Sequence, residues 1–95
     1  MAFVTVSTWS YDEALDESAL AETARENLSQ LKAMGASAAH LVRLSPSEGM
    51  IVVIYPDEGA WNRVRAMVDR MRAGADPKSG GVLTGALAGG ALVSV

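Results

Sequence analysis

His40 is the only histidine of this 95-residue chain, and imidazole is the side chain that ordinarily changes charge between about pH 5 and 8. General acid–base chemistry near neutral pH would therefore use His40 first, and we take it as the candidate catalytic residue. Its neighbours Leu41, Val42 and Leu44 are apolar, which also fits a strand histidine with a satisfied hydrogen bond. No second catalytic group stands at a telling spacing, so the sequence leaves open whether the chain is an enzyme.

Aromatic residues supply the candidate ligand-binding positions. Trp9 and Tyr11 lie at the end of the first predicted strand, where aromatic rings can line the mouth of a small-molecule pocket. The same rings also suit packing against a second copy of the chain, and both alternatives stay open. Tyr55 and Trp61 are the other candidate ligand contacts, although the apolar periodicity around Trp61 favours a place in the core.

Several kinds of site find no support in the residues present. The chain has no cysteine, which excludes disulfides, thiolate nucleophiles and thiolate metal sites. One histidine with scattered carboxylates has no metal-ligand spacing, so we expect no metal. Acidic residues gather at a predicted helix start, where each favours the helix dipole by roughly 0.3–1 kcal/mol; they are Asp12, Glu13, Asp16 and Glu17. Neither a nucleophile-elbow nor a P-loop motif occurs, and we expect no cofactor.

Composition predicts one globular domain over residues 1–95. Hydrophobic residues make up 49% of the chain and charged residues 20%, which is ordinary for a folded domain. The net charge of −3 opposes nucleic-acid binding. A predicted helix carries a basic cluster, which we interpret as its solvent-exposed face. The cluster comprises Arg63, Arg65, Arg70 and Arg72. The segment Met1–Trp9 does not resemble a signal peptide, and we expect a cytoplasmic protein.

The first third of the chain predicts a strand and then a helix. Residues Ala2–Trp9 alternate and are rich in β-branched side chains, as in a strand. A helix begins between Ser10 and Ser18, because both serines suit the cap position. Its apolar stripe has spacings of about one helical turn and comprises Leu20, Ala24, Leu28 and Leu31. Gly35 suits the end of this helix.

The middle of the chain predicts a hairpin and a second helix. His40–Leu44 and Met50–Tyr55 are strand-like, and turn residues Ser45–Gly49 join them. Asp57 can cap the second helix, whose pattern stops near Gly74. The apolar stripe of this helix comprises Ala60, Trp61, Val64, Met67, Val68 and Met71.

The uncharged tail Val82–Val95 follows a Gly/Pro/Ser-rich loop at Asp76–Gly81. A bilayer-spanning helix needs roughly 20 residues, so this tail is too short to cross a membrane as a helix. We predict a last strand that is broken at Gly89–Gly90, with Ala91–Val95 as its firmer half.

The element order strand, helix, strand, strand, helix, strand is the split βαβ arrangement. It predicts a four-stranded antiparallel sheet with both helices on one face. A water-facing second face would need a polar row, yet both sides of Met50–Tyr55 are apolar, and Val4 and Val6 share one side of the first strand. An apolar face of this kind predicts that a second copy covers it through a two-fold axis.

In element order, in length and in the segments Phe3–Trp9 and Met50–Tyr55, the chain resembles the dimeric α/β-barrel proteins. In that family two ferredoxin-like protomers pack their sheets together into one barrel. It includes antibiotic-biosynthesis-type monooxygenases, haem-degrading enzymes, lactone isomerases and many small proteins without assigned activity. Haem-degrading members use an Asn, Trp and His or Tyr constellation, which is not carried over because Trp61 and Asn62 are adjacent here.

The resemblance implies an α+β, ferredoxin-like homodimer that binds a small, largely apolar molecule. One alternative is a cofactor-independent monooxygenase or isomerase, in which His40, Tyr11 or Tyr55 supplies a proton. The other is a structural or assembly module whose interior is filled with side chains and holds no ligand.

Overall fold

Four strands and two helices follow one another in the predicted order. The computed structural model describes residues 2–11, 16–73 and 81–93. The elements are β1 (Phe3–Ser10), α1 (Glu17–Ala33), β2 (Ala38–Ser45), β3 (Glu48–Tyr55), α2 (Glu58–Ala73) and β4 (Val82–Gly90). The predicted acidic residues Asp12 and Glu13, the end of the second helical pattern at Gly74, and most of the predicted Asp76–Gly81 loop lie outside the described residues.

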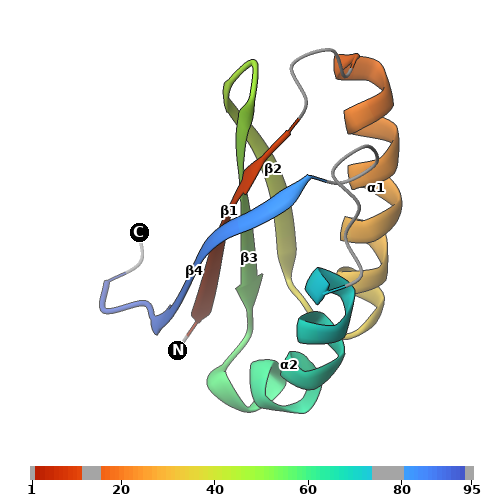
Figure 1. Cartoon of the computed structure of the whole chain (residues 1–95). Coiled ribbons are helices and arrows are strands. Elements are labelled where there is room, and N and C mark those ends of the chain that lie inside the picture. Colours follow the sequence, from red (N-terminus) through yellow and green to blue (C-terminus); the bar gives the residue numbers. More distant parts are fainter. Residues whose placement is uncertain (1, 12–15, 74–80, 94–95) are drawn as a thin grey trace.

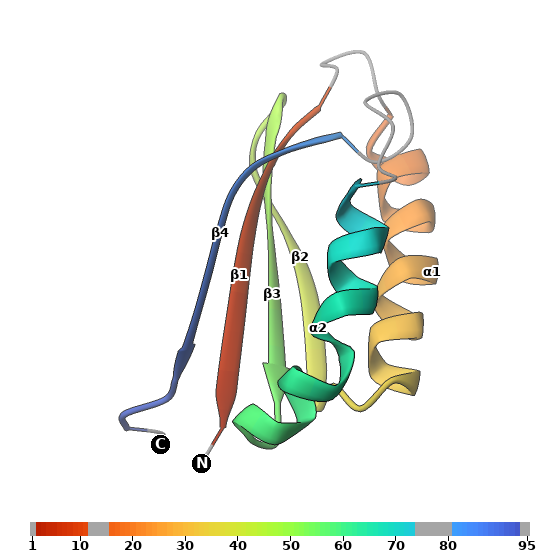
Figure 2. The ribbon, with the colours of Figure 1, turned by 60° about the horizontal axis from the view of Figure 1, so that its bottom comes forward.

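The strands form one antiparallel sheet in the order β2-β3-β1-β4. Figure 1 shows α1 and α2 beside this sheet, and the turned view of Figure 2 places both helices on the same face. The arrangement is the ferredoxin-like α+β fold, which confirms the predicted fold class. Among the described residues, no helix lies on the opposite face.

Alternation along each strand decides which side chains reach the helices. In β1, Thr5, Ser7 and Trp9 are buried on the helix side, whereas the residues between them are only partly buried. Thr5 is opposite Val53 in β3, and Val53 belongs to the main core cluster. The even-numbered residues of β1 and β3 therefore face away from the helices, because side chains of a strand alternate between the two faces.

Helix α1 starts inside the predicted interval. Asp16 is its N-cap, and its Oδ1 accepts a hydrogen bond from the Ser18 backbone N–H at 3.3 Å. Within the helix, Leu20 and Leu31 are the buried residues, one near each end of the predicted stripe. After the helix, Gly35 has a backbone φ of 120°, a value that residues other than glycine rarely adopt.

Helix α2 begins after Asp57, whose Oδ1 accepts from the Ala60 backbone N–H at 2.7 Å. Trp61 and Val68 are buried, as their helical spacing predicts. Met67 differs from the prediction, since its side chain is 48% exposed. It lies at the margin of the apolar stripe, where the helix surface turns towards solvent.

The last strand differs from its prediction. Strand β4 covers Val82–Gly90 without a break at the glycines, and the described part of Ala91–Val95 is not strand. The physical reason is pairing, because β1 is opposite β4 along its whole length, from Phe3 and Gly90 to Ser10 and Val82. Beyond the paired strands, the Ala91 N–H donates one further hydrogen bond to the Ala2 carbonyl at 2.8 Å.

Two groups of buried side chains make up the core. The larger lies under α2 and the C-terminal end of α1 and includes Leu31, Val53, Tyr55, Trp61 and Val68. The smaller comprises Trp9, Tyr11 and Leu20. Within the described part of the chain, no helix has both the length and the apolar character required to cross a membrane.

Candidate functional site

One face of the sheet is left uncovered by the described helices (Figure 2). We call it the open face. Strand alternation and register assign to it Ala38, His40 and Val42 of β2, Met50, Val52 and Ile54 of β3, Val4, Val6 and Thr8 of β1, and Gly85, Leu87 and Gly89 of β4. These positions are almost all apolar, so the open face has the composition of a buried surface.

Cross-strand register arranges the open face in rows that run across all strands. In the central row, His40 is opposite Val52, Val52 opposite Val6, and Val6 opposite Leu87. One flanking row is Ala38, Ile54, Val4 and Gly89, and the other is Val42, Met50, Thr8 and Gly85. The rows are continuous because every neighbouring pair of strands is antiparallel and the register shifts, after Thr8 in β1 and after Arg43 in β2, lie beyond them.

Exposure on the open face is greatest at the edge strands. Leu87 is 76% exposed and Val42 is 39% exposed, whereas Val6 and Val52 in the central strands are partly buried by their neighbours. Contiguous apolar surface of this extent is uncommon on monomeric proteins, whereas single exposed apolar residues are ordinary.

A pair of threonine hydroxyls interrupts the apolar surface. The register of β1 and β4 shifts between Thr8 and Trp9, so that Thr8 is opposite Gly85 and Trp9 opposite Leu83. Thr84 is the extra residue, and its Oγ1 donates a hydrogen bond to Thr8 Oγ1 at 2.9 Å. Sequence reasoning missed this pair; the available signal was a glycine directly after Thr84 inside a strand, which is typical of a bulge.

His40 lies on the open face, on the edge strand β2, and its side chain is exposed. Its central row otherwise holds valine and leucine, and Thr8 and Thr84 lie two and three strands away, on β1 and β4. The catalytic role of His40 stays a prediction.

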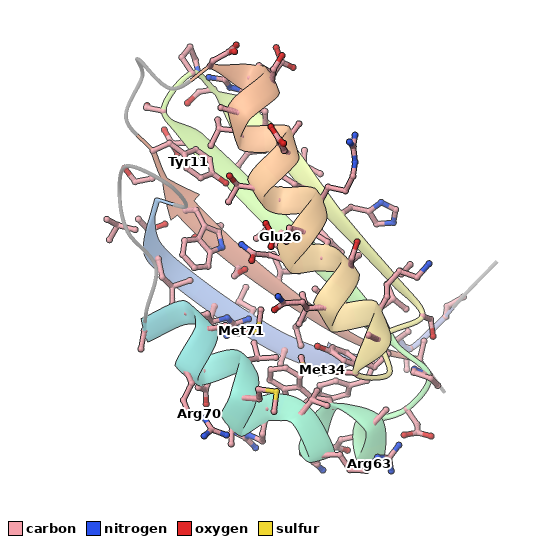
Figure 3. All side chains as sticks on the ribbon, turned by 90° about the vertical axis from the view of Figure 1, so that its right-hand side faces the viewer. Tyr11, Glu26, Met34, Arg63, Arg70 and Met71 are labelled. Carbon is pink, nitrogen blue, oxygen red and sulfur yellow. The ribbon has the colours of Figure 1, made fainter. Side chains whose placement is uncertain are left out.

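Trp9 and Tyr11 lie on the other side of the sheet. Trp9 packs with Leu20, and its Nε1–H donates to Ser7 Oγ at 2.9 Å. Figure 3 shows Tyr11 beside the N-terminal half of α1. Burial raises the pKa of Tyr11, and the positive charge of Arg43 opposes that increase in part.

Tyr11 is held between two glycines. A Cβ atom placed on Gly49 would lie 2.5 Å from the Tyr11 hydroxyl, and one placed on Gly81 would lie 2.6 Å from Tyr11 Cδ1. The Tyr11 backbone N–H also donates to the Ser47 carbonyl at 2.7 Å. Tyr11 is therefore fixed to the hairpin and to the start of β4, with 8% of its surface exposed.

Tyr55 and Trp61 belong to the main core cluster. Tyr55 is fully buried, and its hydroxyl has no hydrogen-bond partner among the described residues. Burial raises the pKa of Tyr55, partly opposed by the charge of Arg72. The structure thus brings Trp9 near Tyr11 and Tyr55 near Trp61, and it leaves His40 on the opposite face. The ligand-binding roles of the four aromatic residues stay predictions.

Two cavities on the helix side are lined by described residues, and one is small and the other open. One of about 40 Å³ lies between α1 and the sheet and is lined in part by Tyr11, Leu20, Ala24 and Leu41, which is room for a water molecule rather than an organic ligand. A wider, open depression lies between α2 and β4 and is lined in part by Asp69, Arg72, Leu83 and Ala86, and we base no site on it. No group of three potential metal ligands occurs among the described residues. The labelled Arg63 and Arg70 project outward from α2 (Figure 3).

The fold and the open face together define a ferredoxin-like domain with one apolar, helix-free sheet surface. No protein-family model matches the chain, and no curated protein matches it.

Proposed function

We propose that the chain is a homodimeric protein of the dimeric α/β-barrel type, in which two open faces meet across a two-fold axis and a small, largely apolar molecule binds between them. The observation that carries this proposal is the set of continuous apolar rows across all strands of the open face. A domain of this size buries a modest share of its surface by itself, so covering the rows adds substantially to its stability. The cysteine-free sequence supports a cytoplasmic location, since small secreted domains are commonly disulfide-dense.

The dimensions of the open face fit a dimer. Strands of eight residues at about 3.4 Å per residue are roughly 27 Å long, and strands about 4.8 Å apart give a sheet roughly 19 Å wide. The projected area is therefore about 500 Å², and the relief of the side chains increases the accessible area above this value. Standard interfaces bury about 800 Å² per partner, which the open face and its rims approach.

Charge favours a second copy as the occupant of the open face. The rows hold one ionisable side chain, His40, and the exposed Glu48 lies beyond them at the hairpin end of β3. Two copies can therefore meet across their centres without burying like charges, which would be costly. A two-fold axis also requires a surface that complements itself, and an uncharged surface of valine, isoleucine and methionine meets this requirement.

Small residues on β4 support a ligand between the two sheets. Gly85 and Gly89 carry no side chain on the open face, and a Cβ atom at Gly89 would have no atom within 4 Å. Interdigitated valine and methionine side chains fill the space between packed sheets about 10 Å apart. Because the two glycines have no side chains, the space next to them between the two sheets is not filled by the protomer that carries them. This space suits an apolar molecule.

The test is the mass of the particle in solution. Native mass spectrometry and light scattering at micromolar concentration should give twice 9.9 kDa for the wild type. Val6→Lys places a charge in the central row and should give monomers, because an unpaired charge is costly to bury. Gln30→Lys, at an exposed position of α1, is the matched control and should stay dimeric. A monomeric wild type, or a dimeric and folded Val6→Lys variant, would refute the interface.

The ligand is tested in the same spectra. Protein purified without heating or solvent extraction should carry extra mass that disappears on mild activation and is absent from the Val6→Lys monomer. A dimer of bare mass under all conditions favours the alternative of an assembly module with a filled interior.

A further inference from the structure

We propose that Thr8 and Thr84 form the polar anchor of the small-molecule site and that they bind the single neutral oxygen of an otherwise apolar ligand, such as a ketone or an alcohol. This inference rests on the proposed function, because it assigns the polar contact of the same site. It uses the one place on the open face where two hydroxyl groups meet, with Oγ1 atoms 2.9 Å apart.

The bulge of β4 creates this pair. Regular alternation would place Thr84 and Gly85 on opposite faces of the sheet, but the register shift after Thr8 turns the Thr84 hydroxyl towards Thr8. Bulges commonly redirect one side chain in this manner, often beside functional sites. The result is a polar spot on an apolar surface that the strand pattern alone would not provide.

The hydrogen-bonding capacity of the two hydroxyls is only partly used by the bond between them. Each hydroxyl has one proton to donate and two lone pairs. Whichever hydroxyl donates to the other, one O–H proton and several lone pairs remain available on the open face. A ketone can accept the free proton, and an alcohol can both accept and donate. A carboxylate ligand is a poorer match, because the pair is neutral and the one ionisable side chain of the rows, His40, lies one row away and two strands from Thr8, at roughly 12 Å, and three strands from Thr84.

Gly85 keeps the hydroxyl pair accessible. A Cβ atom at this position would lie 3.0 Å from Thr8 Oγ1, so any side chain would displace or cover that hydroxyl. Apolar residues border the pair towards the centre of the sheet, whereas Ser10 and Glu48 lie in the next row on its other side. Met50 is opposite Thr8 on β3, and Val6 and Leu87 lie one row away on β1 and β4. The spot therefore offers one hydrogen bond and an apolar rim towards the centre of the sheet, which is the usual composition of a site that orients an apolar ligand.

Two probes of the same shape test the anchor. Acetophenone and ethylbenzene differ by a carbonyl in place of a methylene group, and their binding can be followed by amide nitrogen–proton spectra of the wild-type dimer. Acetophenone should shift the amide signals of Thr8, Thr84 and Gly85. Thr8→Val and Thr84→Val conserve shape and remove a hydroxyl, and each should weaken acetophenone binding about tenfold while leaving ethylbenzene unchanged or tighter. Thr23→Val, on α1 and away from the open face, is the control and should change neither.

The outcomes separate the anchor from the proposed function. Acetophenone binding to other open-face amides with unchanged affinity in both valine variants would refute the anchor and leave the dimer with its ligand in place. A wild-type dimer that binds neither probe would also refute the anchor. A monomer without open-face shifts from either probe would refute both proposals. The valine variants should remain folded, since a cross-strand threonine pair contributes little to sheet stability.

Discussion

The rings of Tyr55 and Trp61 lie with their centroids 5.4 Å apart and their planes tilted by 51°. Tyr55 is the last residue of β3 and Trp61 lies in the first turns of α2, so this contact joins strand and helix across a short connection. Tilted aromatic pairs stabilise by about 0.5–1.5 kcal/mol beyond the area they bury. The ring of Tyr55 therefore contributes to the core, whereas its hydroxyl has no described partner.

Removing the Tyr55 hydroxyl should make the protein more stable. We expect Tyr55→Phe to raise the free energy of unfolding by about 1 kcal/mol, because an unsatisfied buried hydroxyl costs about 1–3 kcal/mol. Urea denaturation followed by circular dichroism measures the change. Tyr55→Leu, which also removes the ring, is the comparison and should be destabilising. A loss of stability in Tyr55→Phe would mean that the hydroxyl is satisfied in solution.

Stability should decrease at alkaline pH. Burial raises the pKa of both Tyr11 and Tyr55 above the ordinary value of 10.0, so the folded state disfavours the phenolates. Stability is then fully present below pH 10 and is lost as the pH rises through the folded-state pKa values. The urea midpoint measured between about pH 8 and 12 should fall in this direction for the wild type and less steeply for Tyr55→Phe. Equal slopes for the two proteins would contradict the role of Tyr55.

Local signals in the sequence predicted the helices well. Asp57 and Gly35 act where a cap and a helix end were expected, because capping depends on a few neighbouring backbone groups. The buried residues Leu20, Leu31, Trp61 and Val68 also follow the predicted stripes. Periodicity specifies which residues of a helix face the core without knowledge of the rest of the fold.

Strand β4 was beyond local prediction. Its glycine and alanine residues give no alternation, and its length is set by pairing with β1, which lies at the other end of the chain. Gly85 directly after Thr84 indicated a bulge in this strand, but the partner of the Thr84 hydroxyl, Thr8, is set by the long-range register with β1. The helix-facing side of β3 was ambiguous as well, because both of its faces are apolar; the register with β1 assigns Val53 and Tyr55 to the core and Val52 to the open face.

The register of the sheet places the predicted site residues on two different faces. Strand alternation placed Trp9 on the helix side, whereas His40 occupies the open face. Aromatic residue type alone does not tell which side of a sheet a ring occupies, since rings suit cores and pockets alike.

The two helix caps should differ in their contributions to stability. Asp57→Ala should lower the free energy of unfolding by about 1 kcal/mol, because its 2.7 Å bond to the Ala60 N–H is short and partly buried. Asp16→Ala is the matched comparison and should cost less, because its bond to the Ser18 N–H is 3.3 Å long and exposed. Urea denaturation of both variants measures the difference. An equal or larger loss for Asp16→Ala would contradict this ranking.

Because Gly49 and Gly81 both lie close to the ring of Tyr11, a side chain at position 49 should be destabilising. In Gly49→Ala the new methyl group would lie 2.5 Å from the Tyr11 hydroxyl, and the ring cannot retreat because Gly81 closes its other side. Overpacking of this kind costs about 1–3 kcal/mol. Gly59→Ala is the comparison, because Gly59 is exposed on α2 and its methyl group would approach only the Asp57 and Arg63 side chains, at 3.2 and 3.6 Å; it should cost much less stability than Gly49→Ala.

A double-mutant cycle with Tyr11→Ala tests whether the ring is the cause. Tyr11→Ala alone should be destabilising because it empties part of the smaller core cluster. Adding Gly49→Ala to this variant should then cost little, since the methyl group would enter the space that the ring had occupied. The sum of the single effects should therefore exceed the effect of the double variant by more than 1 kcal/mol, a coupling typical of residues in direct contact. Additive effects would mean that Gly49 is required for its backbone conformation rather than for its contact with Tyr11.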